Sequence, residues 1–402
     1  AKHINSADIV FISVNTPTKE KGLGAGKASD LKWVEACARQ VAEYSKGHTI
    51  VVEKSTLPVK TAEVIQKILA ASQKLTYTEH KTFDVLSNPE FLAEGTAIND
   101  LENPDRVLIG GENDDAINAL SSIYATWVPK TKILHTNIWS SELAKLTANA
   151  FLAQRISSIN SISALCESTG ADVREVSRAI GSDSRIGSKF LDSGPGFGGS
   201  CFKKDILNLV YLSNYFGLKE VGKFWEGVVE LNTWHQKRIS RLIVSKLFGT
   251  VRGKKIGILG FAFKANTNDT RESSAISICK DLLEEGAFLN IHDPKVDSTQ
   301  IEIDLNLKTY KPENMENIYK NNFKEGIWVY SDNINEVFES ADAVLILTEW
   351  HEYSLIKWKS IYQKMRKPSW IFDARSVINP ENLKGTDLNL WRIGDGSLTK
   401  QI

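Results

Sequence analysis

The chain has 402 residues, as many basic as acidic side chains, and a formal net charge of zero. This balance excludes the strongly basic surface that most nucleic-acid-binding and membrane-surface proteins present. An apolar fraction of 42% and a charged fraction of 24% fit a globular protein of two or three domains. We therefore expect neither a nucleic-acid nor a membrane partner.

The cysteines are far apart in the sequence and include no CxxC pair and no metal-ligand spacing. They are Cys37, Cys166, Cys201 and Cys279. This usage favours a reducing, cytoplasmic setting, and we expect no metal site. The longest apolar run near the start, residues 9–14, is too short for a signal peptide or a membrane span.

The first part of the chain alternates apolar, β-branched runs with helical patterns, which is typical of an α/β domain with a parallel sheet. The expected strands are 7–14, 49–53, 83–87 and 107–111, and the expected helices are 30–44 and 59–69. The run 7–14 has no polar alternation, as in a strand that is buried on both faces of a parallel sheet.

A helical pattern then runs from Ser140 to Glu167 without proline or glycine until Gly170. It predicts one helix of about thirty residues, longer than most helices of globular proteins, and so a helix that bridges domains or subunits. Helical patterns continue to about residue 245.

A second strand-and-helix series follows. We expect strand 254–260, helix 274–285 with Gly286 just after its end, and strand 288–292. Residues 341–348 and 370–375 repeat the appearance of 7–14 and 50–55. The sequence therefore predicts an α/β fold with two Rossmann-like, doubly wound parallel-sheet domains joined by a helical central region with one long helix. The predicted domains are 1–138, 139–250 and 251–402.

Cys201 is the strongest candidate for a reactive group. It ends the glycine-rich run 194–200, and a helical pattern follows it, so the thiol is expected at a helix N-terminus. The partial positive charge there and the neighbouring Lys203 and Lys204 favour the nucleophilic thiolate. Asp205 lies four residues further on and shares the same helix face. We interpret this arrangement as a reactive thiol rather than a buried cysteine after a glycine turn.

Three further segments carry candidate chemistry. Residues 87–95 follow a buried strand, where ligands bind in open α/β sheets, and Glu90 and Glu94 either act on substrate or cap a helix. Lys145 and Asn149 share a helix face and are suited to stabilising an oxyanion, although most helical lysines are simply solvated. Residues 261–274 have no GxGxxG, but they offer cations and a helix N-terminus for a nucleotide diphosphate.

Six motifs together resemble the nucleotide-sugar 6-dehydrogenase family, and most closely its UDP-glucose 6-dehydrogenase members. They are VNTPT at 14–18, EKSTLPVK at 53–60, SNPEFLAEG at 87–95, ELAKLTANAF at 142–151, GFGGSCFKKD at 196–205 and GFAFKANTNDTRESS at 260–274. The resemblance covers the whole chain. It implies an enzyme that uses two NAD+ to oxidise C6 of UDP-glucose to the carboxylate of UDP-glucuronate, by way of a thiohemiacetal and a thioester on the cysteine, and that works as a homo-oligomer built from dimers.

The resemblance also implies roles for individual residues. Cys201 is expected to be the nucleophile, Asp205 to activate water, Glu90 and Thr56 to order that water, and Lys145 and Asn149 to stabilise oxyanions. The expected UDP-sugar contacts are Glu90, Phe91, Leu92, Ala93, Glu94, Lys145, Asn149, Arg185 from a partner subunit, Phe190, Ser193, Gly194, Pro195, Gly196, Phe197, Gly198, Phe263, Lys264 and Arg375. The expected NAD contacts are Val14, Asn15, Thr16, Pro17, Thr18, Ser55, Thr56, Leu57, Glu94 and Arg271.

Two features depart from the family pattern. Asp192 stands where a lysine is expected, and the opening strand, its GxGxxG turn and the acidic ribose-binding residue are missing. We therefore expect an N-terminally incomplete member, with an unpaired strand edge at residues 9–14 and weak turnover. Two alternatives remain: another nucleotide-sugar 6-dehydrogenase, acting on GDP-mannose or UDP-N-acetylmannosamine, or a catalytically silent UDP-sugar-binding subunit.

Overall fold

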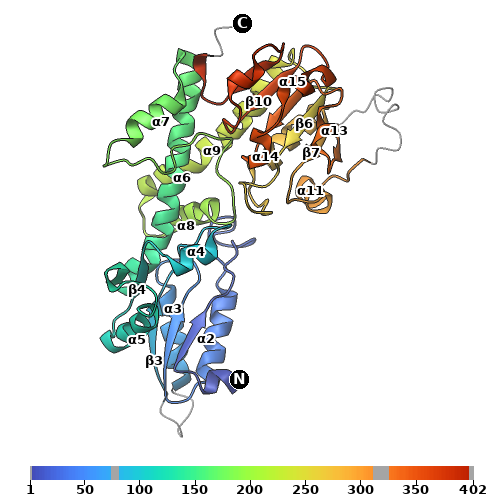
Figure 1. Ribbon diagram of the computed structural model, residues 1–402. Coiled ribbons are helices and arrows are strands. Elements are labelled where there is room, and N and C mark those ends of the chain that lie inside the picture. The colour runs from blue at the N-terminus through green and yellow to red at the C-terminus, as the bar shows by residue number, and fades with distance from the viewer. Residues whose placement is uncertain (1, 74–80, 311–325, 398–402) are drawn as a thin grey trace. The chain divides into compact units, whose positions relative to one another are not determined.

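The computed structural model describes residues 2–73, 81–310 and 326–397, and its chain forms two compact units (Figure 1). The first unit contains residues 1–151 and 204–226, and the second contains residues 152–203 and 227–402. The boundaries between the units fall within or next to α6 (Ile138–Thr169), α8 (Phe202–Tyr215) and α9 (Lys219–Lys246). The three-domain division expected from the sequence stays a prediction.

The first unit contains a five-stranded sheet in the order β1-β2-β3-β4-β5. Its strands are β1 (Ile9–Ile12), β2 (His48–Glu53), β3 (Thr82–Ser87), β4 (Val107–Gly110) and β5 (Ile133–Thr136). Neighbouring strands are parallel except β3 and β4, which meet antiparallel at Ser87 and Gly110. This antiparallel pair is an exception within the predicted parallel-sheet fold, because the chain re-enters the sheet from the edge at which β3 ends.

Helices cover both faces of this sheet, and the strand periodicity decides which residues they meet. Val51 packs into a core with α2 (Lys32–Tyr44) and α3 (Thr61–Gln73), whereas its neighbours Ile50 and Val52 face the core that α5 (Asp114–Tyr124) covers. Successive strand side chains point to opposite faces, so an unbroken apolar run is needed to fill both cores. The remaining elements are α1 (Lys2–Asn5), α4 (Ala97–Glu102) and η1 (Lys130–Lys132).

The second unit contains a parallel six-stranded sheet in the order β11-β10-β9-β6-β7-β8. Its strands are β6 (Lys255–Leu259), β7 (Phe288–His292), β8 (Ile327–Tyr330), β9 (Ala343–Ile346), β10 (Trp370–Asp373) and β11 (Asn389–Arg392). All residues of β6, β7 and β9 are buried, as expected of central strands in a doubly wound sheet.

Short helices and turns connect these strands. They are α10 (Ser274–Glu284), α11 (Ser298–Leu305), α13 (Ile334–Phe338), α14 (His351–Ser354), α15 (Trp358–Ile361), η3 (Tyr362–Lys364) and η4 (Pro380–Leu383). Gly286 has a φ of +83°, which confirms its expected place after the end of α10. Ile239 and Ile243 of α9 are part of the same core as the sheet.

The two pairs of similar segments, 7–14 with 50–55 and 341–348 with 370–375, form equivalent strand pairs in the two units. In the first unit, β1 pairs in parallel with β2, and in the second unit, β9 pairs in parallel with β10. However, β9 has β6 as a second neighbour, whereas β1 has β2 alone among the described residues. Within the described residues, β1 is therefore an edge strand of its sheet.

The long helix is confirmed and spans 32 residues as α6. Six of its buried polar residues are spaced by three, four or eight residues, so they share one face. They are Glu142, Lys145, Asn149, Ser157, Asn160 and Ser163. This polar face serves both units: Glu142, Lys145 and Asn149 belong to the first, and the others belong to the second.

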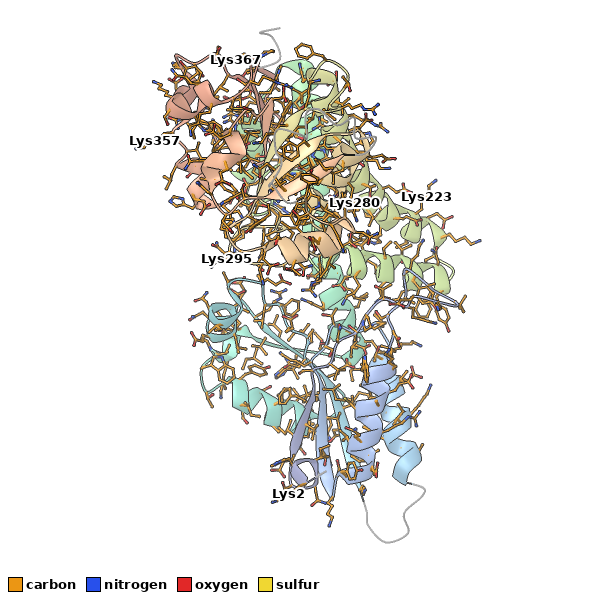
Figure 2. All side chains as sticks on the ribbon, turned by 90° about the vertical axis from the view of Figure 1, so that its right-hand side faces the viewer. Lys2, Lys223, Lys280, Lys295, Lys357 and Lys367 are labelled. Carbon is orange, nitrogen blue, oxygen red and sulfur yellow. The ribbon has the colours of Figure 1, made fainter. Side chains whose placement is uncertain are left out.

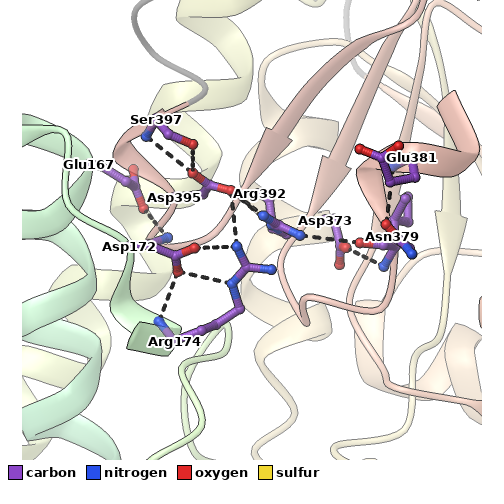
Figure 3. A network of polar contacts seen from close by, with 11 residues as sticks. Glu167, Asp172, Arg174, Asp373, Asn379, Glu381, Arg392, Asp395 and Ser397 are labelled. Carbon is purple, nitrogen blue, oxygen red and sulfur yellow. Dashed lines mark hydrogen bonds and ion pairs between the residues drawn. The ribbon is translucent and has the colours of Figure 1, made fainter. Parts of the chain in front are cut away.

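A charged network attaches the helical part of the second unit to its sheet (Figure 3). Asp395, which is 1% exposed, accepts hydrogen bonds from Arg392 and pairs with Arg174 at 3.4 Å. Arg174 also pairs with Asp172, just before α7 (Val173–Gly181). Glu167 near the end of α6 accepts the Gly394 N–H at 2.8 Å. The end of α6, the start of α7 and the segment after β11 therefore form one connected structure.

Most lysines lie in solvent. Figure 2 labels six exposed examples, which are Lys2, Lys223, Lys280, Lys295, Lys357 and Lys367. Lys145, with a side chain that is 6% exposed, is an exception. Across the described ranges, no helix is both long enough and apolar enough to cross a bilayer.

Candidate active site

In the first unit, polar side chains gather where β2 and β3 end. Glu53 is the last residue of β2 and Ser87 the last of β3, and the segments after them carry Lys54, Asn88 and Glu90. The two strands are parallel, so both segments leave the sheet at the same edge, where ligands bind in α/β folds. This edge is where the sequence analysis places several of its candidates.

Glu90, Phe91 and Lys145 come together there. Lys145 Nζ lies 3.7 Å from Glu90 Oε1, and Glu90 Oε2 accepts the Leu92 N–H at 2.8 Å. The Phe91 ring is contacted by two cations, because Lys145 Nζ lies 5.4 Å and the Arg106 guanidinium 3.7 Å from its centroid. The buried ammonium of Lys145 thus has both an anion and an aromatic face beside it.

Asn149 and Asp205 form a second buried pair. Asn149 Nδ2 donates to Asp205 Oδ2 at 2.6 Å, and both residues are buried. Burial raises the pKa of Asp205, while Lys204, the Asn149 hydrogen bond and Lys145 oppose that rise and Glu90 adds to it. Asp205 is therefore within electrostatic reach of Glu90 and Lys145, and four of the predicted catalytic residues form one interacting group.

The loops after β1 and β2 are joined to each other. Ser55 Oγ donates to the Val14 carbonyl at 2.6 Å, and Thr16 Oγ1 donates to the Thr56 carbonyl at 2.9 Å. Lys204 Nζ donates to the Thr16 carbonyl at 3.4 Å, so α8 contacts the same loop. Asn15, Pro17, Thr18 and Leu57 lie on these two loops. The predicted cofactor residues of the first unit are therefore neighbours.

The loop between β3 and α4 holds the other predicted contacts of this unit. Leu92 and Glu94 are half-buried, and the Ala93 N–H donates to Asp100 Oδ2 at 2.9 Å. Asp100 also accepts the Thr96 hydroxyl, so a carboxylate of α4 organises the end of this loop.

Three residues of this site were not predicted. Lys54 Nζ donates to Asn88 Oδ1 at 3.0 Å and contacts the Tyr124 hydroxyl at 3.1 Å, and that hydroxyl donates to Asn88 Oδ1 at 2.6 Å. Burial lowers the pKa of Lys54 to about 8, with Lys145 adding to the effect and Glu90 opposing it. Lys54 and Asn88 could have been predicted as site residues because they directly follow buried strands. No feature of the sequence marks Tyr124 of α5 as a site residue.

In the second unit, neutral groups fix the glycine-rich loop. Asn160 Oδ1 accepts the Gly194 N–H at 2.9 Å, and His235 Nε2 bonds to the Gly194 carbonyl at 3.0 Å. Asn232 accepts the Phe197 N–H at 2.9 Å and donates to its carbonyl at 3.2 Å. Burial lowers the pKa of His235 to about 4, so this histidine is a neutral donor near pH 7. None of these anchors was predicted from the sequence.

Close packing explains two of the glycines. A Cβ on Gly198 would lie 2.6 Å from the Glu272 carbonyl oxygen and 2.9 Å from Cβ of Phe263. Gly196 has a φ of +142°, a conformation that other residues rarely adopt. Pro195 and Phe197 are buried beside them. The loop therefore lies directly against the segment after β6.

Phe263, Lys264 and Arg375 lie beside this loop. Arg375 donates to the Phe263 carbonyl at 2.9 Å, and its Nη1 lies 3.1 Å from the position that a Cβ on Gly194 would occupy. Lys264 Nζ lies 5.5 Å from the Phe263 ring centroid. The structure therefore brings these predicted UDP-sugar residues together with the loop 194–198.

Two other predicted residues of the second unit, Arg185 and Arg271, form ion pairs with aspartates two residues away in the sequence. Arg185 is exposed and pairs with Asp183 at 2.6 Å, whereas Arg271 pairs with Asp269 at 2.7 Å and its carbonyl accepts the Gly199 N–H. Phe190, Asp192 and Ser193 lie on the segment before the glycine loop. Arg155 of α6, which sequence analysis did not single out, donates to carbonyls of residues 186, 187 and 189 and fixes the preceding turn.

Cys201 is the residue immediately before α8, as its sequence predicts. It is half-buried, and its Sγ lies 3.3 Å from the Ser200 hydroxyl. Asp205 stands in the first turn of the same helix. A thiol at a helix start, with a carboxylate one turn further on, is suited to covalent catalysis.

Three family descriptions match consecutive segments of the chain. Residues 1–128 match the NAD binding domain of the UDP-glucose/GDP-mannose dehydrogenase family, residues 139–234 match its central domain, and residues 257–380 match its UDP binding domain. The chain belongs to the UDP-glucose/GDP-mannose dehydrogenase family. The resemblance found in the sequence is thereby confirmed, as is NAD as the cofactor of the family.

Curated relatives extend the similarity over most of their length. A UDP-glucose 6-dehydrogenase of Drosophila melanogaster is 54% identical over 397 residues, which are 97% of this chain and 81% of that protein. UDP-glucose 6-dehydrogenase 4 of Arabidopsis thaliana is 52% identical over 98% of this chain and 82% of its own.

Solved structures agree in fold. A UDP-glucose dehydrogenase from Pyrobaculum islandicum has a TM-score of 0.79 at 29% identity and covers 98% of this chain and 81% of its own. A UDP-D-ManNAc dehydrogenase from Pyrococcus horikoshii has a TM-score of 0.77 at 25% identity and covers 98% of this chain and 83% of its own. The predicted α/β fold with Rossmann-like domains and a helical centre is confirmed.

Proposed function

We propose that this family member oxidises C6 of UDP-glucose to the carboxylate of UDP-glucuronate, with two NAD+ and a covalent intermediate on Cys201. The observation that carries the proposal is Cys201 at the start of α8, with buried Asp205 one turn along, in a chain 54% identical to a UDP-glucose 6-dehydrogenase. A thiol that traps an aldehyde between two oxidations suits a four-electron reaction.

The proposed reaction consists of two oxidations and one hydrolysis. The C6 alcohol loses a hydride and a proton and becomes an aldehyde, and the Cys201 thiolate adds to it to form a thiohemiacetal. Loss of a second hydride and proton gives a thioester, which water cleaves to the carboxylate and the free thiol. NAD supplies the hydride acceptor in each oxidation. The sum is one alcohol, two NAD+ and one water converted to one carboxylate, two NADH and three protons.

The first unit supplies the charged groups for this chemistry. Lys145 and Asn149 are buried donors suited to stabilising the oxygen charge of the tetrahedral species. Burial raises the pKa of Asp205, which makes its carboxylate a better base for the hydrolytic water. Glu90 and Thr56 are proposed to order that water. The partners of Lys145 and Asp205, at 3.7 Å and 2.6 Å, hold them in place.

The loops at the carboxyl edge of the first sheet fit the NAD that the family binds. The loops at 14–18 and 55–57 are hydrogen-bonded to each other where parallel β1 and β2 end, which is where dinucleotides bind in such sheets. Glu94 and Arg271 are proposed as further NAD contacts. The loops offer backbone groups and hydroxyls, which suit a neutral amide or a ribose.

The second unit is proposed to hold the UDP-sugar. Lys264 and Arg375 lie beside the glycine loop and are suited to phosphate oxygens, and Gly194 and Gly198 let backbone N–H groups approach the ligand. The remaining proposed sugar contacts of this unit are Phe190, Ser193, Pro195, Gly196, Phe197 and Phe263, and those of the first unit are Glu90, Phe91, Leu92, Ala93, Glu94, Lys145 and Asn149. Arg185 is proposed to reach the site of a partner subunit, a role that its exposed side chain allows.

We further propose a cytoplasmic homo-oligomer built from dimers. Large apolar residues are exposed where α8 meets α9, and a second copy of the chain is their proposed partner. They are Tyr215, Phe216, Leu218, Val221 and Phe224. All four cysteines are free thiols, which supports a reducing compartment.

The experiment that tests this proposal is a substrate panel at fixed NAD. We expect UDP-glucose to be oxidised with two NADH formed per UDP-glucuronate, and UDP-N-acetylmannosamine and GDP-mannose to be poor substrates. Cys201→Ser should still bind UDP-glucose but form no UDP-glucuronate, because a serine hydroxyl is a far weaker nucleophile near pH 7. Wild-type turnover by Cys201→Ser, or one NADH per product, would overturn the assignment.

A further inference from the structure

Two buried carboxyl groups of the first unit have no role in the proposed reaction. Glu53 ends β2 and Glu142 lies in the first part of α6, and their exposed fractions are 1% and 3%. Their carboxyl groups are in hydrogen-bonding contact with each other, and Glu53 also contacts the Ser87 side chain. A buried pair of acids is costly unless its charge is compensated, so the partners of each need explanation.

Glu142 caps the start of a helix that is remote in sequence. Its Oε2 accepts the Lys60 N–H at 2.6 Å and its Oε1 accepts the Ala62 N–H at 2.8 Å, at the beginning of α3. The first N–H groups of a helix have no partner within the helix and favour an anion. Lys60 has a φ of +77°, a strained conformation for a lysine, and its N–H is one of the two groups that Glu142 holds.

The segment from Lys54 to Lys60 directly follows Glu53 and carries proposed cofactor and water-ordering residues. Leu57 is buried in the core under the segment, and Ser55 and Thr56 are hydrogen-bonded to the loop after β1. Glu53 directly precedes this segment, and the Glu142 carboxylate accepts the N–H of its last residue, Lys60. A shift of this end would therefore displace Thr56 relative to the first sheet.

We propose that Glu142 is a positioning residue of the reaction: it fixes the segment from Lys54 to Lys60 so that Ser55 and Thr56 stand where NAD and the hydrolytic water require them, and Glu53 sets its charge. This inference rests on the proposed function, because that function gives Ser55 and Thr56 their roles. Glu142 acts through the backbone of Lys60 and Ala62 and does not itself touch a ligand.

The two acids share one proton, and their surroundings decide which of them holds it. The N–H bonds from the start of α3 favour the anion at Glu142, whereas Glu53 faces that anion and its Oε2 is buried without a hydrogen-bond partner. Burial and Glu142 raise the pKa of Glu53 well above its usual range, and burial also raises the pKa of Glu142. Over the described residues, no lysine or arginine forms an ion pair with either acid. Glu53 is therefore the protonated member.

The pH dependence follows from the sign of these shifts. Between the ordinary carboxyl pKa and the raised pKa of Glu53, the folded chain holds a proton that the unfolded chain releases. The contribution of Glu53 to stability is therefore full below the ordinary carboxyl pKa and is lost as pH rises through the raised pKa. At that point two anions face each other under the segment. The groups that act on the pair come from β2 (Glu53), β3 (Ser87), α6 (Glu142) and the backbone at the start of α3.

The test compares Glu142→Gln with Glu53→Gln in the full chain. A glutamine at 53 has the shape of the protonated acid and still donates to Glu142, so kcat should stay near wild type. A glutamine at 142 accepts with only one atom, so kcat/KM for NAD should fall by roughly tenfold to a hundredfold, while the UDP-glucose dissociation constant stays unchanged. The alkaline fall of kcat/KM for NAD should be weaker in Glu53→Gln than in wild type.

A rescue variant separates positioning from simple destabilisation. Glycine adopts the positive φ of residue 60 without strain, so Lys60→Gly should restore part of the NAD efficiency lost in Glu142→Gln. If Glu142→Gln does not fold, the alkaline profiles of wild type and Glu53→Gln decide alone. Equal alkaline falls in these two proteins, or losses of the same size for both glutamine variants, would overturn the inference. A wild type that does not oxidise UDP-glucose would instead contradict the proposed function.

Discussion

The candidate functional residues of the first unit and those that fix the glycine loop of the second unit are different kinds of groups. In the first unit, Lys54, Glu90, Lys145 and Asp205 are ionisable, and burial or neighbouring charges act on them. In the second unit, neutral groups hold the loop 194–199 by its backbone. The group in the first unit is suited to moving protons, and the loop in the second unit to keeping a fixed shape.

Substitutions in the two units should therefore have different effects. Interactions between charges in a partly buried group are strong and depend on protonation, so substitutions in the first unit should alter rate and pH dependence. A loop fixed by backbone hydrogen bonds and close packing has little freedom, so substitutions in the loop of the second unit should alter substrate affinity and stability.

The largest expected effect is that of Lys145→Ala. Loss of the buried ammonium removes an oxyanion donor and leaves Glu90 without its partner, so kcat should fall by about 10²–10³-fold while UDP-glucose affinity falls much less. Steady-state kinetics and calorimetry measure the two quantities. Lys223→Ala, an exposed lysine of the same unit, is the matched control and should be near wild type (Figure 2). An equal loss of affinity and rate would contradict the prediction that substitutions in the first unit act mainly on rate.

Lys264→Ala is the corresponding test in the second unit. A charge-assisted contact with phosphate contributes about 1.5–3 kcal/mol, so UDP-glucose affinity should fall on the order of tenfold to a hundredfold while NAD affinity is retained. Titration calorimetry with each ligand checks this, with the exposed Lys280→Ala as its control. Equal weakening of both ligands would mean that the roles of the two units are confused.

Gly198→Ala probes shape without changing charge. The added Cβ would meet the Glu272 carbonyl oxygen at 2.6 Å, and backbone cannot move aside cheaply, so we expect a loss of about 1–3 kcal/mol in stability and a raised KM for UDP-glucose. Thermal unfolding and kinetics measure both. Gly227→Ala in α9 is the matched control, since a Cβ there has nothing within 4 Å. A normal KM in Gly198→Ala would show that the loop is not rigid.

The prediction with the smallest effect at neutral pH concerns His235 and acid. Its folded pKa of about 4 lies below the ordinary histidine value, so the unfolded chain binds the additional proton. Stability should therefore decline by at most ~1.4 kcal/mol per pH unit as pH falls from about 6.5 to 4. His235→Gln keeps a donor for the Gly194 carbonyl and should lessen this decline in urea unfolding. An unchanged pH profile would show that other groups cause it.

The sequence predicted the contacts that depend on local spacing. Asp205 one turn after Cys201, and Lys145 and Asn149 on one face of α6, follow from helix periodicity, while the place of Glu90 follows from a buried strand that ends just before it. Most strands of the two sheets were found for the same reason, since apolar runs mark them, whereas β5, β8 and β11 were not predicted.

Contacts that join distant parts of the chain could not be predicted. Asn160, Asn232 and His235 reach the glycine loop over 34 to 41 residues and bond mainly to its backbone, which has no sequence signature. The antiparallel pairing of β4 depends on the path of the chain after β3, and the Glu53–Glu142 contact depends on how α6 packs on β2. A single sequence carries no record of such choices.

The most direct test of the account is mass spectrometry of Asp205→Asn quenched during turnover with UDP-glucose and NAD. Removal of the proposed base should slow thioester hydrolysis, so the adduct should accumulate. We predict a mass gain equal to UDP-glucuronate less one water, confined to the peptide that contains Cys201 and absent from the same variant with Cys201→Ser. An adduct on another residue, or continued product formation without any adduct, would contradict the claim that Cys201 carries the intermediate and Asp205 serves its hydrolysis.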